Sequence, residues 1–173
     1  MKGKITLNLA TSIDGFIADL DGGYAWIAGQ GDKSLDTEKE FPFGDFVSSI
    51  DVVVMGHESY LQGFAKDYQA KTVYVATSKA YEDTENLKFI GGDIVTPVLA
   101  ARDAGKNVYL FGGGITIAPF IQANVIDAYH IGIVPIILGK GRPLFLGNTP
   151  PVPLLLQDYC IRDGITELHY IKK

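Results

Sequence analysis

Short apolar runs recur along the chain, and each one is followed by glycine or by small polar residues. The alternation or β-branched composition of these runs predicts four buried strands, at 5–10, 51–55, 72–76 and 107–111. Segments with helix signals separate most of these strands. Because parallel strands need a long crossover connection, usually a helix, this order predicts an α/β domain with a mainly parallel sheet.

Helix signals occur in three segments, at 36–49, 92–105 and 115–123. The first has apolar residues at helical spacing, but Pro42 and Gly44 should confine its regular helix to the second half. In the second, Asp93 or Thr96 can cap the amino end, and Gly105 can stop the carboxyl end. We therefore expect helices here, of which the first is short.

The last third of the chain predicts further strands. A long strand-like run spans 126–138, and Pro135 within it indicates a sheet edge or a bulge. The runs 153–162 and 166–171 are separated by Asp163 and Gly164, a pair typical of a tight turn between antiparallel strands. The sheet should therefore be mixed, with a mainly parallel body and a C-terminal antiparallel hairpin.

Length and charge exclude several classes of protein. With 173 residues, we expect one domain that spans 1–173. The net charge of −5 argues against a nucleic-acid partner, because such binding relies on lysine and arginine. No apolar run approaches the roughly 20 residues that span a bilayer, so we expect no membrane partner and a cytoplasmic location. Cys160 is the only cysteine, which leaves no internal disulfide.

Small and polar residues follow the four predicted strands, at 10–15, 56–60, 77–79 and 112–116. Ligands of open α/β sheets bind at the carboxyl ends of the strands, so these segments form the candidate site. The triplet Gly112, Gly113 and Gly114 leads into a predicted helix, where bare backbone N–H groups could approach a phosphate. The triplet also fits a purely structural strand-to-helix turn. It matches neither G-x-G-x-x-G nor a P-loop.

Five stretches, at 10–18, 54–60, 75–79, 110–115 and 135–145, together resemble a known family. They occur in the order found in proteins with the dihydrofolate reductase-like fold. Within that fold they resemble the reductase domain of the bifunctional riboflavin-biosynthesis deaminase/reductase and its small stand-alone relatives. The resemblance implies a three-layer fold with helices on both faces of the sheet. It also implies NADPH-dependent hydride transfer to a small heterocycle or a ribosylaminopyrimidine, as in 5-amino-6-(5-phosphoribosylamino)uracil reductase.

The resemblance assigns most of the strand-end residues to the cofactor NADPH. The implied cofactor contacts are Ala10, Ile17, Gly56, His57, Glu58, Ser59, Thr77, Ser78, Lys79, Phe111, Gly112, Gly113, Gly114, Ile115 and Thr116. The family usually has arginine where this chain has His57, which could instead be a surface residue of a helix. Lys79 could supply the missing positive charge for a 2′-phosphate, so NADPH is favoured over NADH.

Asp14 is the carboxylate that the resemblance places nearest the nicotinamide, and we predict a catalytic role for it. Its alternative role is turn formation, because Asp-Gly is a common turn pair. The predicted substrate contacts are Ser12, Trp26 and Glu40. Trp26 could stack on a heterocycle or cover the core. Glu40, like Glu38, could match the first-helix acid with which dihydrofolate reductases hold the pterin ring, or it could face solvent.

Two other functions stay open at this point, namely dihydrofolate reduction and nicotinamide-nucleotide binding without catalysis. Few basic residues accompany the predicted site, although a ribose phosphate would need them, so the substrate also stays open. His130 and His169 lie in separate strand-like runs without a cysteine or acidic cluster, and we expect no metal. The apolar run 131–138 could form a subunit contact, and we expect a homodimer, which the family often forms.

Overall fold

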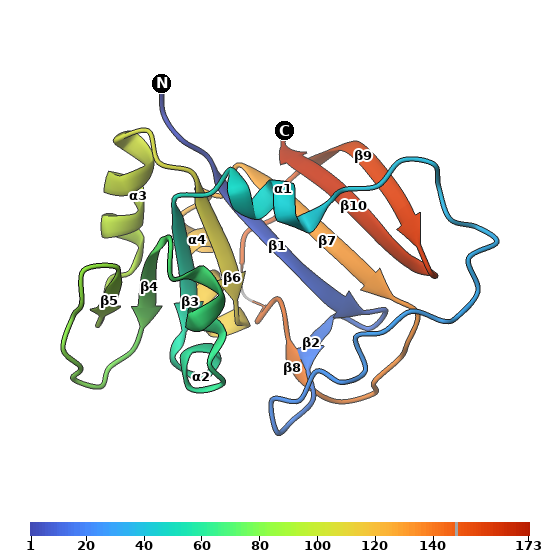
Figure 1. Ribbon diagram of the computed structural model, residues 1–173, viewed down its shortest axis with the longest axis horizontal. Coiled ribbons are helices and arrows are strands. Elements are labelled where there is room, and N and C mark those ends of the chain that lie inside the picture. The colour runs from blue at the N-terminus through green and yellow to red at the C-terminus, as the bar shows by residue number, and fades with distance from the viewer. Residues whose placement is uncertain (148) are drawn as a thin grey trace.

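The computed structural model describes residues 1–147 and 149–173 of the chain (Figure 1). The strands are β1 (Ile5–Ser12), β2 (Phe16–Ala18), β3 (Val52–Gly56), β4 (Thr72–Ala76), β5 (Leu87–Ile90), β6 (Val108–Gly112), β7 (Ala128–Val134), β8 (Arg142–Pro143), β9 (Leu154–Arg162) and β10 (Ile165–Lys172). The helices are α1 (Phe43–Ser48), α2 (His57–Leu61), the 3-10 helix η1 (Phe64–Tyr68), α3 (Val95–Asp103) and α4 (Gly114–Gln122). Strands β2 and β8 form a short ribbon, and the others form one sheet in the order β5-β4-β3-β6-β1-β7-β10-β9.

The sheet is mixed, as the sequence predicts. Neighbouring strands from β5 to β7 run parallel, whereas β10 is antiparallel to both β7 and β9. The four predicted buried strands correspond to β1, β3, β4 and β6, and the predicted hairpin corresponds to β9 and β10. Its turn lies at Asp163 and Gly164, whose φ angles of 48° and 78° suit a two-residue turn between twisted strands.

Helices cover both faces of the sheet, which confirms the expected three layers. On one face, Ile5, Leu7 and Leu110 belong to a buried cluster with Val98 of α3 and Phe120 of α4. On the opposite face, strand residues of the other parity pack with residues of α1, α2 and η1. Figure 1 shows α1 and α2 in front of the strands and α4 behind them. Because side chains alternate along a strand, the continuous apolar runs supply both layers.

The run 126–138 forms a shorter strand than expected, and this strand lies inside the sheet. β7 pairs with β1 on one side and with β10 on the other, so the edge position inferred from Pro135 is wrong. Pro135 directly follows the last residue of β7, where its missing N–H removes no ladder bond. The sequence does not predict β5 or the β2–β8 ribbon, because such short strands give too few positions for a period-two pattern.

The three helices that the sequence predicts begin and end near their local signals. α1 begins directly after Pro42, so only the second half of the first helical segment is helical. The backbone N–H groups of Val95 and Thr96 donate to Asp93 Oδ1 at 2.9 and 3.1 Å, and Asp93 thereby satisfies free donors at the amino end of α3. α3 ends before Gly105, whose φ is 89°. No helix within the described residues is long and apolar enough to cross a membrane.

Gly114 allows the backbone of residues 143–144 to pack closely against the amino end of α4. A Cβ added to Gly114 would lie 2.5 Å from Pro143 O and 2.9 Å from Leu144 O, too close for any side chain. Gly44 in α1 differs, since an added Cβ would meet no atom within 4 Å. The two helical glycines therefore form a matched pair for testing this packing.

We expect Gly114→Ala to lower the free energy of unfolding by about 1–3 kcal/mol, because backbone segments on both sides would have to move apart. Gly44→Ala should raise it by about 0.5–1 kcal/mol, since alanine is the better helix former. Urea unfolding followed by circular dichroism measures both values. Equal stabilities of the two variants would contradict the packing described.

Candidate functional site

The carboxyl ends of β1, β3, β4 and β6 lie at one edge of the sheet, in the lower half of Figure 1. The parallel register places Gly56 beside Ala76, and Met55 beside Gly112. Most of the predicted cofactor contacts lie in the last residues of these strands or in the segments that follow them, and they therefore gather along this edge. Their role in cofactor binding stays a prediction.

The glycine triplet after β6 contains two glycines that the fold requires and one that it does not. Gly112 has a φ of 132°, which favours glycine, and the Gly112–Gly113 peptide bond is cis. Gly114 is required by the nearby backbone of residues 143–144. Gly113 has a φ of −80°, and an added Cβ would meet only Ile17 Cδ1, at 3.4 Å. The protein's own packing therefore does not explain why residue 113 is glycine.

Helix α4 begins at this triplet and presents free backbone donors. Its first internal hydrogen bond runs from Ile117 N to Gly113 O at 3.0 Å, so the N–H groups of residues 114–116 precede the helical ladder. Ile115 is 82% exposed, whereas Thr116 is buried. Free N–H groups at a helix amino end, next to a bare glycine, form an arrangement that binds phosphate groups in many proteins. The residues present thus fit a diphosphate.

Polar residues that follow β3 and β4 lie at the same edge. His57 Nε2 lies 2.7 Å from the Tyr81 hydroxyl, and the two rings are tilted with centroids 5.6 Å apart. Thr77 Oγ1 accepts a hydrogen bond from Lys79 N at 3.1 Å. Lys79 is exposed, and its side chain forms no ion pair within the described part of the chain. Its charge is thus available to an anion.

Arg142 also reaches this edge, a position that the sequence alone does not define. β8 brings its guanidinium to α2, where it forms an ion pair with Glu58. The hydrogen bond and charge of Arg142 lower the pKa of the Glu58 carboxyl. Glu58 directly follows His57, so a guanidinium lies near His57. The Glu58 carboxylate, however, balances the charge of that guanidinium. Only the antiparallel pairing of β8 with β2 fixes this position, and the sequence carries no signal for that pairing.

Asp14 holds two loops together. Its carboxylate accepts hydrogen bonds from Ser12 Oγ at 2.6 Å, Gly139 N at 2.7 Å and Leu138 N at 3.1 Å. The Ser12 hydroxyl, followed by these backbone donors, lowers the pKa of Asp14. A carboxylate that three donors keep ionised is better suited to fixing loops than to delivering a proton. The catalytic role of Asp14 stays a prediction.

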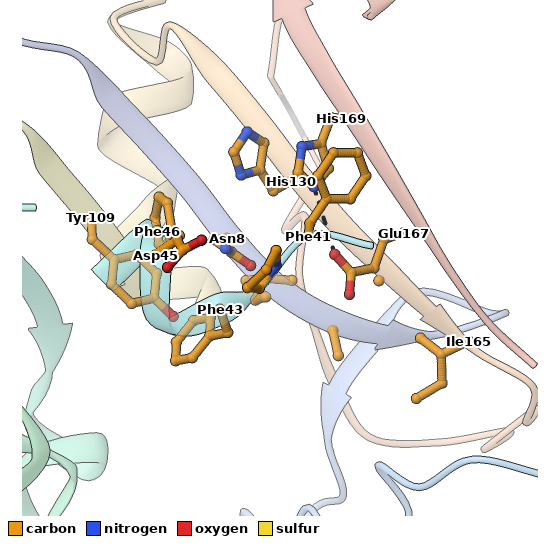
Figure 2. Close-up of a pocket in the computed structure, with 14 residues that line it drawn as sticks. Asn8, Phe41, Phe43, Asp45, Phe46, Tyr109, His130, Ile165, Glu167 and His169 are labelled. Atoms are coloured by element: carbon orange, nitrogen blue, oxygen red, sulfur yellow. Dashed lines mark ion pairs between the residues drawn. The ribbon is translucent and has the colours of Figure 1, made fainter. Parts of the chain in front are cut away.

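A cavity of about 460 Å³ lies between α1 and the sheet, and we call it the α1 cavity (Figure 2). It is lined by Asn8, Leu9, Ala10, Phe41, Pro42, Phe43, Asp45, Phe46, Tyr109, His130, Gly132, Ile165, Glu167 and His169. This volume is within the range of small-molecule sites. Ala10, a predicted cofactor contact, lies in the carboxyl-terminal half of β1, so the α1 cavity extends toward the edge that carries the cofactor segments.

Two histidines from neighbouring strands stack in the wall of the α1 cavity. His130 of β7 lies opposite His169 of β10, with ring centroids 3.7 Å apart and ring planes 6° from parallel. Phe41 also stacks on His169, at 3.7 Å. Burial, together with the neighbouring His169, lowers the pKa of His130 to about 4, so this imidazole is neutral near pH 7. Within residues 1–147 and 149–173, no group of three or more histidine, cysteine or acidic side chains could hold a metal ion.

A second cavity of about 420 Å³ shares this aromatic wall. Phe41, Phe46, His130 and His169 line both cavities. The second cavity lies toward the amino end of β1, where it is lined by Lys4. The wall thus separates two compartments on one face of the sheet.

None of the three predicted substrate contacts lines the α1 cavity. Ser12 is bonded to Asp14, and Trp26 lies in the long loop between β2 and α1. The Glu40 carboxylate pairs with Arg162 Nη2 of β9 at 2.6 Å. Their roles in substrate binding stay predictions, but these positions do not favour them.

The acid on the first helix is Asp45, which lines the α1 cavity. Glu38 and Glu40 precede α1, so neither is a helical residue. The sequence held a signal for this position, because Pro42 and Gly44 already restrict the helix to the residues that follow them. Combining that restriction with the expected first-helix acid leads to Asp45.

Comparison with known proteins finds one matching family model and a relative that is similar along nearly the whole chain. Residues 64–169 match the family model of the RibD C-terminal domain. The uncharacterised protein YwjB of Bacillus subtilis (strain 168) is 30% identical over 179 residues, which cover 99% of both chains.

Solved structures share the fold. A candidate riboflavin biosynthesis protein from Shewanella sp. PV-4 is 24% identical with a TM-score of 0.80, and the match covers 100% of this chain and 99% of that one. The diaminohydroxyphosphoribosylaminopyrimidine deaminase/5-amino-6-(5-phosphoribosylamino)uracil reductase of Thermotoga maritima is 17% identical with a TM-score of 0.72, covering 99% of this chain and 57% of that one. Dihydrofolate reductase from Enterococcus faecalis, complexed with NADP(H), is 14% identical with a TM-score of 0.67, covering 99% and 98%. The expected dihydrofolate reductase-like fold is confirmed.

The low pKa of His130 makes the stability of the fold depend on pH. In the unfolded chain this imidazole is protonated near pH 6.5, whereas in the folded chain it is protonated only near pH 4. The folded state therefore loses stability as the pH falls between these two values. Between pH 6.5 and about pH 4.5, we expect the free energy of unfolding to fall by roughly 1–2 kcal/mol more in the wild type than in His130→Gln, after allowance for partial exposure. Urea titrations at several pH values measure the difference, and parallel pH profiles would contradict the buried neutral imidazole.

Proposed function

The chain belongs to the RibD C-terminal domain family, and from that premise we propose that it is an NADPH-dependent reductase of a small heterocyclic or ribosylaminopyrimidine-type substrate. The proposed reaction resembles that of 5-amino-6-(5-phosphoribosylamino)uracil reductase in riboflavin biosynthesis. Family membership supports a reductase in general. The cofactor and the substrate rest on the arguments that follow.

Gly113 is the observation that carries the cofactor proposal. It adjoins the free N–H groups at the amino end of α4, and the protein's own packing gives no reason for a glycine there. A diphosphate laid against those donors would need the space that a Cβ would fill. The same donors would meet the phosphate charge at the positive end of the helix dipole. Gly113 is thus the position where the proposed diphosphate would lie against the backbone.

The choice of NADPH over NADH rests on the loop after β4. Thr77 and Ser78 offer hydroxyl groups, and Lys79 offers a cation that no acidic side chain in the described residues neutralises. A 2′-phosphate needs such donors. Arg142 could contribute only by leaving Glu58, which makes Lys79 the better candidate.

Bound NADPH would supply the hydride from its nicotinamide ring, and the protein would supply position and a dry site. The α1 cavity would hold the acceptor ring, since it extends along β1 to Ala10. Asp14 would act at a distance by fixing the loops that close over the ends of β1 and β7.

Dihydrofolate reduction is the second candidate, and Asp45 is the observation that favours it. Dihydrofolate reductases hold the pterin ring with an acid on the first helix, and Asp45 on α1 lines the α1 cavity. A carboxylate can accept two hydrogen bonds from an aminopyrimidine edge. Dihydrofolate offers such an edge through its 2-amino group and the neighbouring ring N–H.

An oxidation assay tests the proposal. The purified protein is mixed with NADPH or NADH, and oxidation is followed after addition of dihydrofolate, 5-amino-6-(5-phosphoribosylamino)uracil or its unphosphorylated counterpart. Faster oxidation with NADPH and one of these substrates is the expected result. Binding of NADPH without turnover of any of the three substrates would favour a non-catalytic nucleotide-binding protein.

We expect Gly113→Ala to fold normally but to bind NADPH at least about tenfold more weakly, a loss of about 1.4 kcal/mol. Its methyl group meets little in the protein and would instead occupy the space of the proposed diphosphate. Fluorescence titration with NADPH measures binding, and urea unfolding checks that stability changes by less than about 0.5 kcal/mol. Gly44→Ala is the matched control and should bind as the wild type does. Unchanged affinity in Gly113→Ala would place the diphosphate elsewhere.

We also propose a homodimer that forms through β9. The run 131–138 does not offer the contact, because β7 is paired on both sides. β9 is an edge strand, and Leu155, Leu156 and Tyr159 on it are 49%, 47% and 54% exposed. An exposed apolar edge is normally covered by a partner. Light scattering should give a dimer for the wild type and a monomer for Leu155→Lys, and a monomeric wild type would refute this interface.

A further inference from the structure

The charged side chains that line the α1 cavity are all acidic. Asp45 of α1 and Glu167 of β10 are its only aspartate and glutamate, and no lysine or arginine lines it. Figure 2 shows the two carboxyl groups approaching the α1 cavity from opposite sides. His130 adds no compensating charge, since its lowered pKa keeps it neutral near pH 7. The lining of the α1 cavity therefore holds two carboxylates and no lysine or arginine.

Both carboxylates have unused capacity to accept hydrogen bonds. Within residues 1–147 and 149–173, the Asp45 carboxylate receives no hydrogen bond and takes part in no ion pair. Glu167 Oε2 lies 3.6 Å from His169 Nε2, an ion pair when His169 is protonated but too long for a hydrogen bond, so the carboxylate can still accept hydrogen bonds (Figure 2). Acceptors that face a cavity without donors favour a ligand that brings its own N–H groups.

Two cations near the α1 cavity are committed to other acids. Lys39, whose ammonium lies over the Phe41 ring, forms an ion pair with Asp158. Arg162 Nη2 pairs with Glu40 at 2.6 Å, and its Nη1 lies 3.8 Å from Asp36. A phosphate in the α1 cavity would have to break an existing ion pair to gain either of these two cations.

Building on the proposed reductase function, we propose that the α1 cavity selects an unphosphorylated, amino-substituted heterocycle, and that Asp45 and Glu167 are the residues that determine this specificity. The carboxylates accept hydrogen bonds from the amino groups of the ring. The same carboxylates repel a phosphate dianion, because like charges disfavour each other in a partly buried site. The chain thus takes the dephosphorylated counterpart of the family's phosphoribosyl substrate.

Direct binding tests this specificity without any hydride transfer. The two probes are 5-amino-6-(ribosylamino)uracil and its 5′-phosphate, titrated calorimetrically into the wild-type protein. We expect the unphosphorylated probe to bind at least about tenfold more tightly. Glu167→Gln should reduce this preference several-fold, and Glu167→Lys should reverse it. Glu38→Gln removes the same charge outside the α1 cavity and should leave the preference unchanged.

Three results would overturn the proposal. The first is equal or tighter binding of the 5′-phosphate by the wild type. If Lys4→Ala then lost this binding, the phosphate would be assigned to the second cavity. The second is an unchanged preference in both Glu167→Gln and Asp45→Asn. The third is binding of neither probe, which would exclude aminopyrimidines from the α1 cavity. Because NADPH oxidation is measured separately, failure of this proposal is distinguishable from failure of the reductase assignment.

Discussion

The candidate site depends on one constraint, which is the parallel pairing of β1 with both of its neighbours. β1 lies between β6 and β7, and all three strands run in the same direction. Parallel pairing sends every carboxyl end to the same edge, so loops far apart in sequence meet there. It also requires helices as crossovers, and those helices cover the faces and bury the strands on both sides. The apolar strand runs and the glycine-rich strand ends are two results of the same topology.

The glycine-rich turn after β6 shows how structural and ligand requirements can be separated. Gly112 is required by its positive φ, and Gly114 by the backbone that packs on it. Gly113 has ordinary backbone angles, and an added Cβ would meet only the end of the Ile17 side chain. A motif that looks uniform in the sequence therefore consists of residues with different reasons for being glycine. Only the residue that the fold leaves unexplained carries information about a ligand.

Local signals predicted the strands, the helix ends and the C-terminal turn, because short-range rules control them. Asp93 at the start of α3 and the turn at Asp163 are examples. Long-range pairing was not readable from the sequence. His130 and His169 are in contact only because β7 and β10 are neighbours, and Arg142 reaches Glu58 only through the β2–β8 ribbon. The lining of the α1 cavity depends on such pairings. For this reason, none of the substrate contacts predicted from the sequence belongs to that lining.

The hydrogen bonds of Asp14 have a mechanical consequence. One carboxylate binds the turn after β1 to the backbone at Leu138 and Gly139, beyond the end of β7. Independent movement of either loop would strip donors from an ionised acid. A displacement of one loop is therefore transmitted to the other, although more than 120 residues separate them in the sequence.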